Sequence, residues 1–322
     1  IVFPVIVFPV IVFPWYYKWG LGLDVMDFEG SFTVMITPFS EGGDEIDVPA
    51  LRRFVDWQIS EGVPGLIPLG STGEFLSIGQ EERIQVVETV IGQAAGRVPV
   101  LIGTADEWTD KAVAFSREVE QLGANGVMVV PPYYSSPTED ELFEHYRRIA
   151  EAISIPLMVY NNPNTANVDL SPHFLARLAQ VDNIRYVKES SGDISRVREI
   201  DRLTGGRMTV FAGYHAYDSI RLGAKGYVSV CGNIVPRLSA DIYRLASRSE
   251  TVDEGRELYH RLMPLLDAIS GDLYVSATKA AMHLIGMSVG NPRPPRLALP
   301  GANVAALRQV LSNLGVLEEK AA

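Results

Sequence analysis

Eight short apolar runs, separated by segments with helical periodicity, dominate the chain from Gly30 onward. They are rich in β-branched residues and nearly continuous in apolar character, which is typical of parallel strands covered on both faces. The runs span residues 32–37, 65–69, 98–103, 126–130, 156–160, 185–188, 209–212 and 227–230. Eight successive strand-then-helix units predict a closed parallel (β/α)8 barrel, the TIM barrel of the α/β class.

An open doubly wound sheet is the alternative arrangement of such units. It requires a glycine-rich phosphate-binding turn after the first strand, whereas residues 32–37 run into Pro38. The intervening segments carry helix signals: Thr138 and Glu141 form a capping-box pattern, and Ser171 precedes a proline. The barrel therefore remains the leading prediction.

The predicted barrel accounts for only part of the chain. We expect its core over residues 26–235. Residues 236–322 predict the last barrel helix and a C-terminal helical extension, with helices over 254–269, 278–284 and 304–314.

Residues 1–25 do not belong to this pattern. They begin with a five-residue unit, IVFPV, repeated almost three times, and prolines at positions 4, 9 and 14 interrupt the apolar run. A secretory signal needs an early basic region and an unbroken apolar segment, and a membrane helix tolerates such prolines poorly. We interpret the segment as an appended or artefactual stretch before a natural start at Met26, with an apolar interaction tail as the alternative.

The charge and the cysteine content restrict the partners of the protein. The formal net charge is −11, which argues against nucleic acid or an anionic membrane as the main partner. Cys231 is the single cysteine, so no intramolecular disulfide can form, and a reducing, cytoplasmic location is expected. No two of the five histidines have metal-ligand spacing, so we expect no metal site.

Lys188 is the strongest candidate for a catalytic group. Active sites of such barrels lie at the C-terminal ends of the strands, and Lys188 ends the sixth predicted strand. The other five lysines fall in the tails, on predicted helices or before the eighth strand: Lys18, Lys111, Lys225, Lys279 and Lys320. A lysine buried in a barrel mouth has a lowered pKa, so its free amine can attack a ketone. The alternative is a structural lysine paired with Glu189 or Asp193.

Other polar residues follow neighbouring strands. Tyr160 can relay protons as a phenol, or it can be a core tyrosine bonded to a carbonyl group. Ser71 and Thr72 lie in a glycine-flanked turn, where they can hold a carboxylate or merely cap the next helix. Tyr134 is more typical of packing than of catalysis, and Cys231 of a small buried residue.

Three motifs, in this order, resemble those of the dihydrodipicolinate synthase/N-acetylneuraminate lyase family. They are Gly70-Ser-Thr-Gly-Glu74, Tyr160-Asn-Asn-Pro163 and Lys188-Glu-Ser-Ser-Gly-Asp193, and the resemblance extends from about residue 30 to 317. It implies a class I aldolase-type lyase in which Lys188 forms a Schiff base with pyruvate or a related 2-oxo acid. No metal or organic cofactor is implied, and a homotetramer built as a dimer of dimers is common in the family.

The resemblance also implies roles for individual residues. Tyr160 is the expected proton relay, and Ser71, Thr72 and Gly70 are expected at the carboxylate of the 2-oxo acid. Tyr134 matches a tyrosine that a neighbouring subunit donates to the active site. Gly213 and Val228 match positions that line the pyruvate pocket.

Thr165 departs from the family pattern. Dihydrodipicolinate synthases usually carry an arginine five residues after the catalytic tyrosine, where it binds the carboxylate of the aldehyde substrate. A hydroxyl group cannot replace that charge. The sequence therefore leaves three alternatives open: a 2-keto-3-deoxy sugar-acid aldolase or dehydratase, an N-acetylneuraminate lyase-like enzyme, and a pyrroline-carboxylate deaminase of the hydroxyproline pathway. A 2-oxo acid-binding regulatory protein is the alternative that is not an enzyme.

Overall fold

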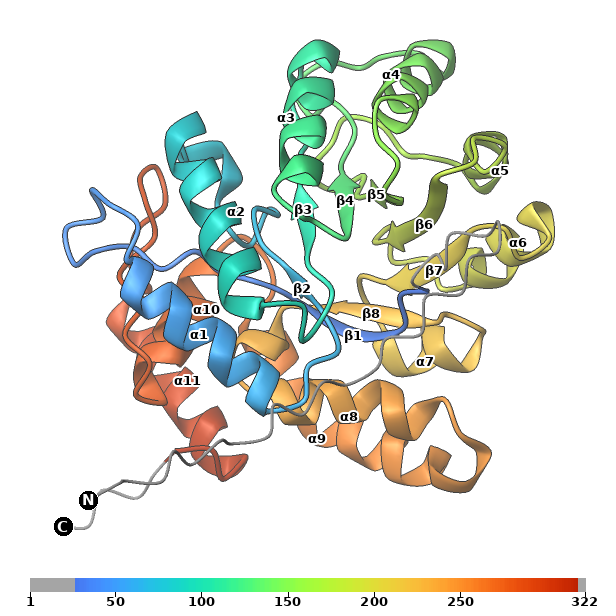
Figure 1. Ribbon diagram of the computed structural model, residues 1–322. Coiled ribbons are helices and arrows are strands. Elements are labelled where there is room, and N and C mark those ends of the chain that lie inside the picture. Colours follow the sequence, from blue (N-terminus) through green and yellow to red (C-terminus); the bar gives the residue numbers. More distant parts are fainter. Residues whose placement is uncertain (1–26, 318–322) are drawn as a thin grey trace, which may run out of the picture.

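Eight parallel strands form a barrel in the computed structural model, which describes residues 27–317 (Figure 1). The strands are β1 Gly30–Val34, β2 Leu66–Ile67, β3 Leu101–Gly103, β4 Gly126–Val129, β5 Leu157–Asn161, β6 Ile184–Glu189, β7 Thr209–Ala212 and β8 Gly226–Ser229. Their order is β2-β1-β8-β7-β6-β5-β4-β3. A parallel bridge between Leu66 and Val100 joins the two ends of this order. The TIM barrel predicted from the sequence is therefore confirmed.

The first four strands are shorter than the apolar runs that predict them. The first run predicts a strand over 32–37, whereas β1 ends at Val34. The Met35 amide still donates to the Ile67 carbonyl, and side chains make the next bonds. The Ile36 amide donates to the side-chain oxygen of Asn233 at 2.9 Å, and the Thr37 hydroxyl donates to the carbonyl of Gly73 at 2.8 Å. Apolar character continues through this segment because it stays buried, so the sequence could not reveal where strand pairing stops.

Helices follow the strands and cover the outside of the barrel. The first eight are α1 Val48–Ser60, α2 Gln80–Ala94, α3 Thr109–Gln121, α4 Glu139–Glu151, α5 Pro172–Leu178, α6 Ser195–Thr204, α7 Ala216–Arg221 and α8 Pro236–Ala246. The predicted helix starts are confirmed at α4, where Thr138 and Glu141 form a capping box, and at α5, where Ser171 caps the helix ahead of Pro172.

The C-terminal extension contains α9 Val252–Ala268, α10 Tyr274–Leu284 and α11 Gly301–Asn313. Helix α10 begins at Tyr274, four residues before the predicted start at 278. In Figure 1 helix α9 runs beside α8, and α10 lies next to α11. The division of the chain after residue 235 stays a prediction, and residues 1–25, interpreted above as an appended stretch, lie outside the described residues. Within residues 27–317 no helix is long and apolar enough to cross a membrane.

Four aromatic rings fill the barrel interior beneath the catalytic end. The Phe32 and Phe211 rings come from strands β1 and β7, which are not adjacent, and their centroids lie 5.4 Å apart. Tyr186 lies 6.0 Å from Phe211 and 4.9 Å from Phe28. Gly226 makes room for this layer, since a Cβ atom there would lie 2.1 Å from the Phe211 ring. Tyr186 and Lys188 are two residues apart on β6, so both point inward and the ring layer forms the floor beneath Lys188.

Candidate active site

Lys188 lies inside the barrel, next to Tyr160. The two residues are paired in register on the adjacent strands β6 and β5. The Lys188 ammonium nitrogen, Nζ, lies 3.8 Å from the centroid of the Tyr160 ring, and only 6% of Lys188 is exposed. Burial lowers the pKa of Lys188 from its ordinary value of 10.5 to about 7. A large fraction of this amine is therefore uncharged, and nucleophilic, at neutral pH.

Tyr160 is held through its hydroxyl group. The side-chain amide of Asn162 donates a hydrogen bond to this oxygen at 2.8 Å. Burial raises the pKa of Tyr160 to about 12, and Asn162 and the nearby Ser190 hydroxyl oppose this shift. The phenol therefore keeps its proton at neutral pH and can donate it to a group that gains negative charge.

The turn with Ser71 and Thr72 closes one side of the site. Leu69 and Glu74, on either side of this turn, both have left-handed backbone conformations, with φ of 59° and 57°. Such values are uncommon outside glycine, so they indicate that surrounding contacts hold the turn in this shape. A side chain at Gly70 would lie 2.9 Å from Val34, so the turn fits tightly against the barrel wall. Thr72 is buried.

A buried ion pair holds this turn from the far side. The Lys279 ammonium of α10 lies 2.9 Å from a carboxylate oxygen of Glu74, and both side chains are at most 1% exposed. Lys279 also donates to the carbonyl of Asn291 at 3.2 Å, and its nitrogen lies 4.0 Å from the Phe39 ring centroid. The second oxygen of Glu74 accepts from the backbone amide of Arg293 at 2.9 Å.

Lys279 corrects the expectation that Lys188 is the only lysine at the catalytic end. Its helix was predicted, but the face of the barrel on which that helix packs was not. The motif Gly70-Ser-Thr-Gly-Glu74 contained a usable signal, because a buried glutamate requires a cationic partner. Lys279 is nevertheless a poor nucleophile, because its ammonium group is bound to Glu74 and to the Asn291 carbonyl.

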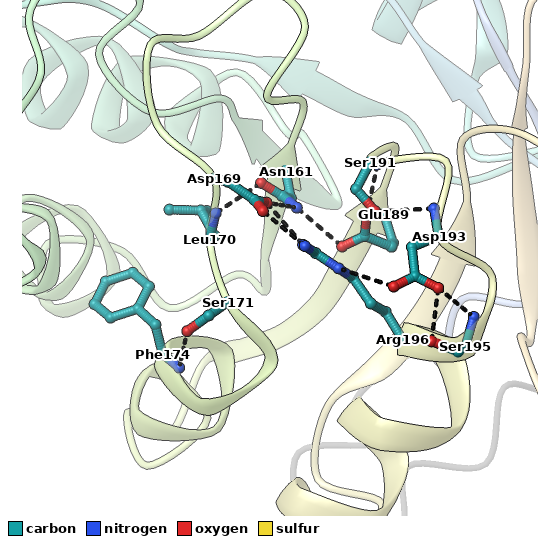
Figure 2. Close-up of polar contacts among 10 residues, drawn as sticks. All are labelled: Asn161, Asp169, Leu170, Ser171, Phe174, Glu189, Ser191, Asp193, Ser195 and Arg196. Atoms are coloured by element: carbon teal, nitrogen blue, oxygen red, sulfur yellow. Dashed lines mark hydrogen bonds and ion pairs between the residues drawn. The ribbon is translucent and has the colours of Figure 1, made fainter.

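A polar network supports the catalytic strands from outside the barrel (Figure 2). Asn161 and Glu189 are paired in register, one position beyond Tyr160 and Lys188. The side-chain amide of Asn161 donates to Glu189 and to Asp169, both at 3.0 Å. Arg196 donates two bonds to Asp169, at 2.7 and 2.6 Å.

This network also fixes charge and loop position. The Arg196 guanidinium lowers the pKa of Asp169, so both members of the pair stay charged. The backbone amide of Leu170 donates to the side-chain oxygen of Asn161 at 2.9 Å, which ties the loop after β5 to the strand itself. Glu189 accepts hydrogen bonds from Asn161 and from the Ser191 amide rather than from Lys188. The geometry therefore does not favour a structural pairing of Lys188 with Glu189.

Gly213 and Val228 lie on the two strands that complete the inner wall. Gly213 follows β7, and a Cβ atom there would lie 1.7 Å from the hydroxyl oxygen of Ser190. Glycine is therefore required at this position, where the ends of β7 and β6 approach each other closely. Val228 is buried in β8 and paired with Phe32, so it faces the barrel interior.

Among residues 27–317, no contact brings Tyr134 or Thr165 to Lys188. Tyr134 is 87% exposed, and its carbonyl accepts from the side chain of Asn167 at 2.7 Å. Thr165 is exposed in the loop after β5, and its hydroxyl makes a 3.5 Å contact with the Asn162 carbonyl. Cys231 is fully buried, and burial raises the pKa of its thiol, as expected for a packing residue.

One tyrosine near the site was missed by the sequence analysis. Tyr274 is the first residue of α10. Burial and the neighbouring Tyr160 raise the pKa of Tyr274, whereas Thr72 and Arg296 lower it. Tyr274 thus lies beside both the Ser71–Thr72 turn and the proposed relay. Within residues 27–317 no group of three or more His, Cys, Asp or Glu side chains could hold a metal ion.

Comparison with known proteins assigns the family. The profile of the Dihydrodipicolinate synthetase family matches residues 27–314. The chain belongs to this family. It is 33% identical over 293 residues to the 4-hydroxy-tetrahydrodipicolinate synthase of Thermodesulfovibrio yellowstonii, covering 90% of this chain and 100% of that protein. The dihydrodipicolinate synthase-like lyase expected from the sequence is therefore confirmed.

Solved structures agree with this assignment. The chloride-inhibited dihydrodipicolinate synthase of Acinetobacter baumannii, crystallised with pyruvate, has a TM-score of 0.87 and 30% identity, and the match covers 90% of this chain and 99% of that one. A dihydrodipicolinate synthase variant described as monomeric has a TM-score of 0.86 and 30% identity, with 92% and 100% coverage.

Proposed function

We propose that Lys188 forms a Schiff base with pyruvate or a closely related 2-oxo acid, and that the resulting enamine adds to an acceptor carbonyl group. The observation that carries the proposal is the buried Lys188 amine, whose pKa lies near 7 and whose nitrogen lies 3.8 Å from the Tyr160 ring centroid. The pyruvate complex of the Acinetobacter baumannii relative supports the choice of substrate.

The reaction begins at the ketone carbon of the 2-oxo acid. The lone pair of the Lys188 amine attacks this carbon. The ketone oxygen takes up two protons, one from the attacking nitrogen and one from an acid, and leaves as water, which yields the protonated imine. Loss of a proton from the adjacent carbon gives the enamine. This carbon then bonds to the carbonyl carbon of the acceptor, whose oxygen takes up a proton. Hydrolysis consumes one water and returns Lys188, so the cycle balances.

Tyr160 and the Ser71–Thr72 turn supply protons and orientation in this scheme. The Tyr160 phenol keeps its proton at neutral pH, because burial raises its pKa to about 12. It can therefore donate to the departing ketone oxygen and recover the proton later. The hydroxyls of Ser71 and Thr72, with the backbone amides of their turn, bind the carboxylate of the 2-oxo acid.

Borohydride trapping tests this proposal. The enzyme is incubated with pyruvate and sodium borohydride, and the adduct is located by peptide mass spectrometry. The expected adduct lies on Lys188, and Lys188→Ala should abolish it, whereas Lys225→Ala, at the opposite end of the barrel, should not. An adduct on another lysine, or turnover by Lys188→Ala, would contradict the proposal.

We further propose a cytoplasmic homo-oligomer in which Tyr134 enters the active site of a neighbouring subunit. Its side chain is 87% exposed, and Leu76 and Trp108 are each 58% exposed. These three side chains lie in one region, because Tyr133 packs against Phe75 with ring centroids 5.9 Å apart, and the Tyr133 amide donates to Glu107 at 2.5 Å. Exposed apolar side chains grouped in this way are typical of protein–protein contacts.

A further inference from the structure

Arg296 carries a guanidinium group that no residue of the described chain binds. It is half-buried in the segment between α10 and α11. Within residues 27–317 its side chain makes no hydrogen bond or ion pair, in contrast to other cations of the catalytic end. Lys279 pairs with Glu74 at 2.9 Å, Arg293 with Glu82 at 2.6 Å and Arg196 with Asp169 at 2.6 Å.

Two hydrogen bonds locate Arg296 at the mouth of the barrel. Three residues earlier, the backbone amide of Arg293 donates to Glu74, which ends the turn that contains Thr72. One residue later, the carbonyl of Leu297 accepts from the Ser276 hydroxyl at 2.7 Å, in the first turn of α10. Arg296 therefore lies between the Ser71–Thr72 turn and the start of α10.

The electrostatic environment places the charge on the same side. Arg296 lowers the pKa of Tyr274, and so does Thr72, while burial and Tyr160 raise it more strongly. Tyr214, which follows Gly213, also has its pKa raised by burial and by Tyr160. Arg296 thus adds a positive charge to a mouth lined by Tyr160, Tyr214 and Tyr274, which are neutral at pH 7.

We propose that Arg296 binds a carboxylate carried by the acceptor substrate, so that the enzyme selects acidic over neutral carbonyl compounds. The inference rests on the Schiff-base function proposed above. The carboxylate of the 2-oxo acid already has the hydroxyls and amides of the Ser71–Thr72 turn as partners. An unpaired guanidinium is suited to bind a second carboxylate through two parallel hydrogen bonds. Exposed Thr165 offers no charge for this purpose.

The test compares an acidic with a neutral acceptor in the wild-type enzyme and in Arg296→Gln. Pyruvate is condensed with succinic semialdehyde, which carries a carboxylate, or with butanal, which does not. We expect Arg296→Gln to lower kcat/KM for succinic semialdehyde by about 10- to 100-fold, the range for a lost hydrogen bond to a charged group. The value for butanal should change by less than about threefold. Arg261→Gln is the matched control, since Arg261 is exposed on α9 and loses the same charge.

The outcomes separate this inference from the proposed function. Borohydride trapping of pyruvate on Lys188 should be unchanged in Arg296→Gln, with the same dependence on pyruvate concentration. Weaker trapping would place Arg296 at the 2-oxo acid and overturn the inference. Two results for Arg296→Gln would also overturn the inference: an equal loss of kcat/KM for both aldehydes, or no loss for either. The wild-type enzyme would overturn it if it did not use succinic semialdehyde, or did not prefer it to butanal. Absence of any wild-type adduct would instead overturn the Schiff-base function.

Discussion

The fold keeps the Lys188 amine away from water. The ring layer of Phe28, Phe32, Tyr186 and Phe211 lies beneath it, and Tyr160 covers its nitrogen. No carboxylate within the described residues is paired with its ammonium form, so burial alone lowers its pKa to about 7. The same burial has consequences for both reactivity and stability.

The rate of imine formation should follow the deprotonation of Lys188. Below pH 7 the amine is mostly protonated, and the free form decreases about tenfold per pH unit. The rate of trapping with pyruvate should therefore rise with pH and level off above an apparent pKa of about 7. Rapid-quench borohydride assays from pH 5 to 9 measure it. A rate that is still rising steeply at pH 9 would show an amine with an ordinary pKa.

Lys188→Met should stabilise the protein while abolishing catalysis. The pKa of Lys188 is about 7 in the folded state and 10.5 when unperturbed, so the unfolded chain binds more protons between these pH values. Folding must remove the charge or bury it, and we expect a gain of about 2–4 kcal/mol in the free energy of unfolding at pH 7.

The gain should shrink as the pH rises from 7 toward 10.5, because the unfolded lysine then loses its proton as well. Urea unfolding at several pH values measures this difference. Lys225→Met, which removes an exposed lysine, should show little change in stability and little dependence on pH. If the gain in the free energy of unfolding of Lys188→Met did not depend on pH, this would argue against a lowered pKa of Lys188.

The sequence predicts residues of this site where a motif and a strand end coincide. Lys188, Tyr160, Gly213 and Val228 all lie on or directly after the predicted strands, so the barrel geometry brings them together. Tyr274 and Arg296 could not be found in this way. They belong to the C-terminal extension, whose amphipathic pattern predicts helices but not the barrel face on which they pack.

At the scale of elements, β5 and β6 depend on the side chain of Asn161. It is fully buried and satisfies Glu189, Asp169 and the Leu170 amide together. Asn161→Leu would leave the buried Leu170 amide unpaired and remove one hydrogen bond each from Glu189 and Asp169, so the loss should be about 3 kcal/mol or more in the free energy of unfolding.

We also expect kcat to fall while trapping still labels Lys188, because the alignment of Tyr160 with Lys188 depends on this pair of strands. Urea unfolding and steady-state kinetics test both effects. Asn303→Leu, in the exposed first turn of α11, is the control and should leave both unchanged. If Asn161→Leu did not change the free energy of unfolding, the network in Figure 2 would contribute little to the stability of the protein.

The Glu74–Lys279 pair links the second βα turn to α10. Both side chains are buried, so removing one partner leaves an uncompensated charge. Lys279→Met and Glu74→Gln should each destabilise the protein by about 3 kcal/mol, and the double variant by clearly less than the sum. A double-mutant cycle from urea unfolding measures the coupling. Additive losses would contradict a direct pairing.

At the scale of the whole molecule, the repeated strand-then-helix pattern predicts the closed barrel because eight such units suffice to close it. The pattern carries no information on how the extension closes over the catalytic end. That arrangement depends on single long-range contacts, such as those of Lys279 and Arg293 with Glu74. The sequence likewise does not show whether one chain completes its own site. In the structure, Tyr134 of this chain points to solvent.

Complementation between two inactive variants decides whether Tyr134 acts across an interface. If it does, a mixed dimer of Lys188→Ala and Tyr134→Phe has one site with Lys188 from one subunit and Tyr134 from the other. Each mixed dimer has one intact site of two, so the isolated mixed dimer should have about half of the wild-type activity.

Co-expression of the two variants with different tags, followed by isolation of the doubly tagged species, provides the sample. Native mass spectrometry confirms its composition. Doubly tagged dimers without activity would place Tyr134 outside the neighbouring site, as would full activity of Tyr134→Phe alone. A wild-type protein that is monomeric at assay concentrations would exclude the shared site altogether, because no neighbouring subunit would then supply Tyr134.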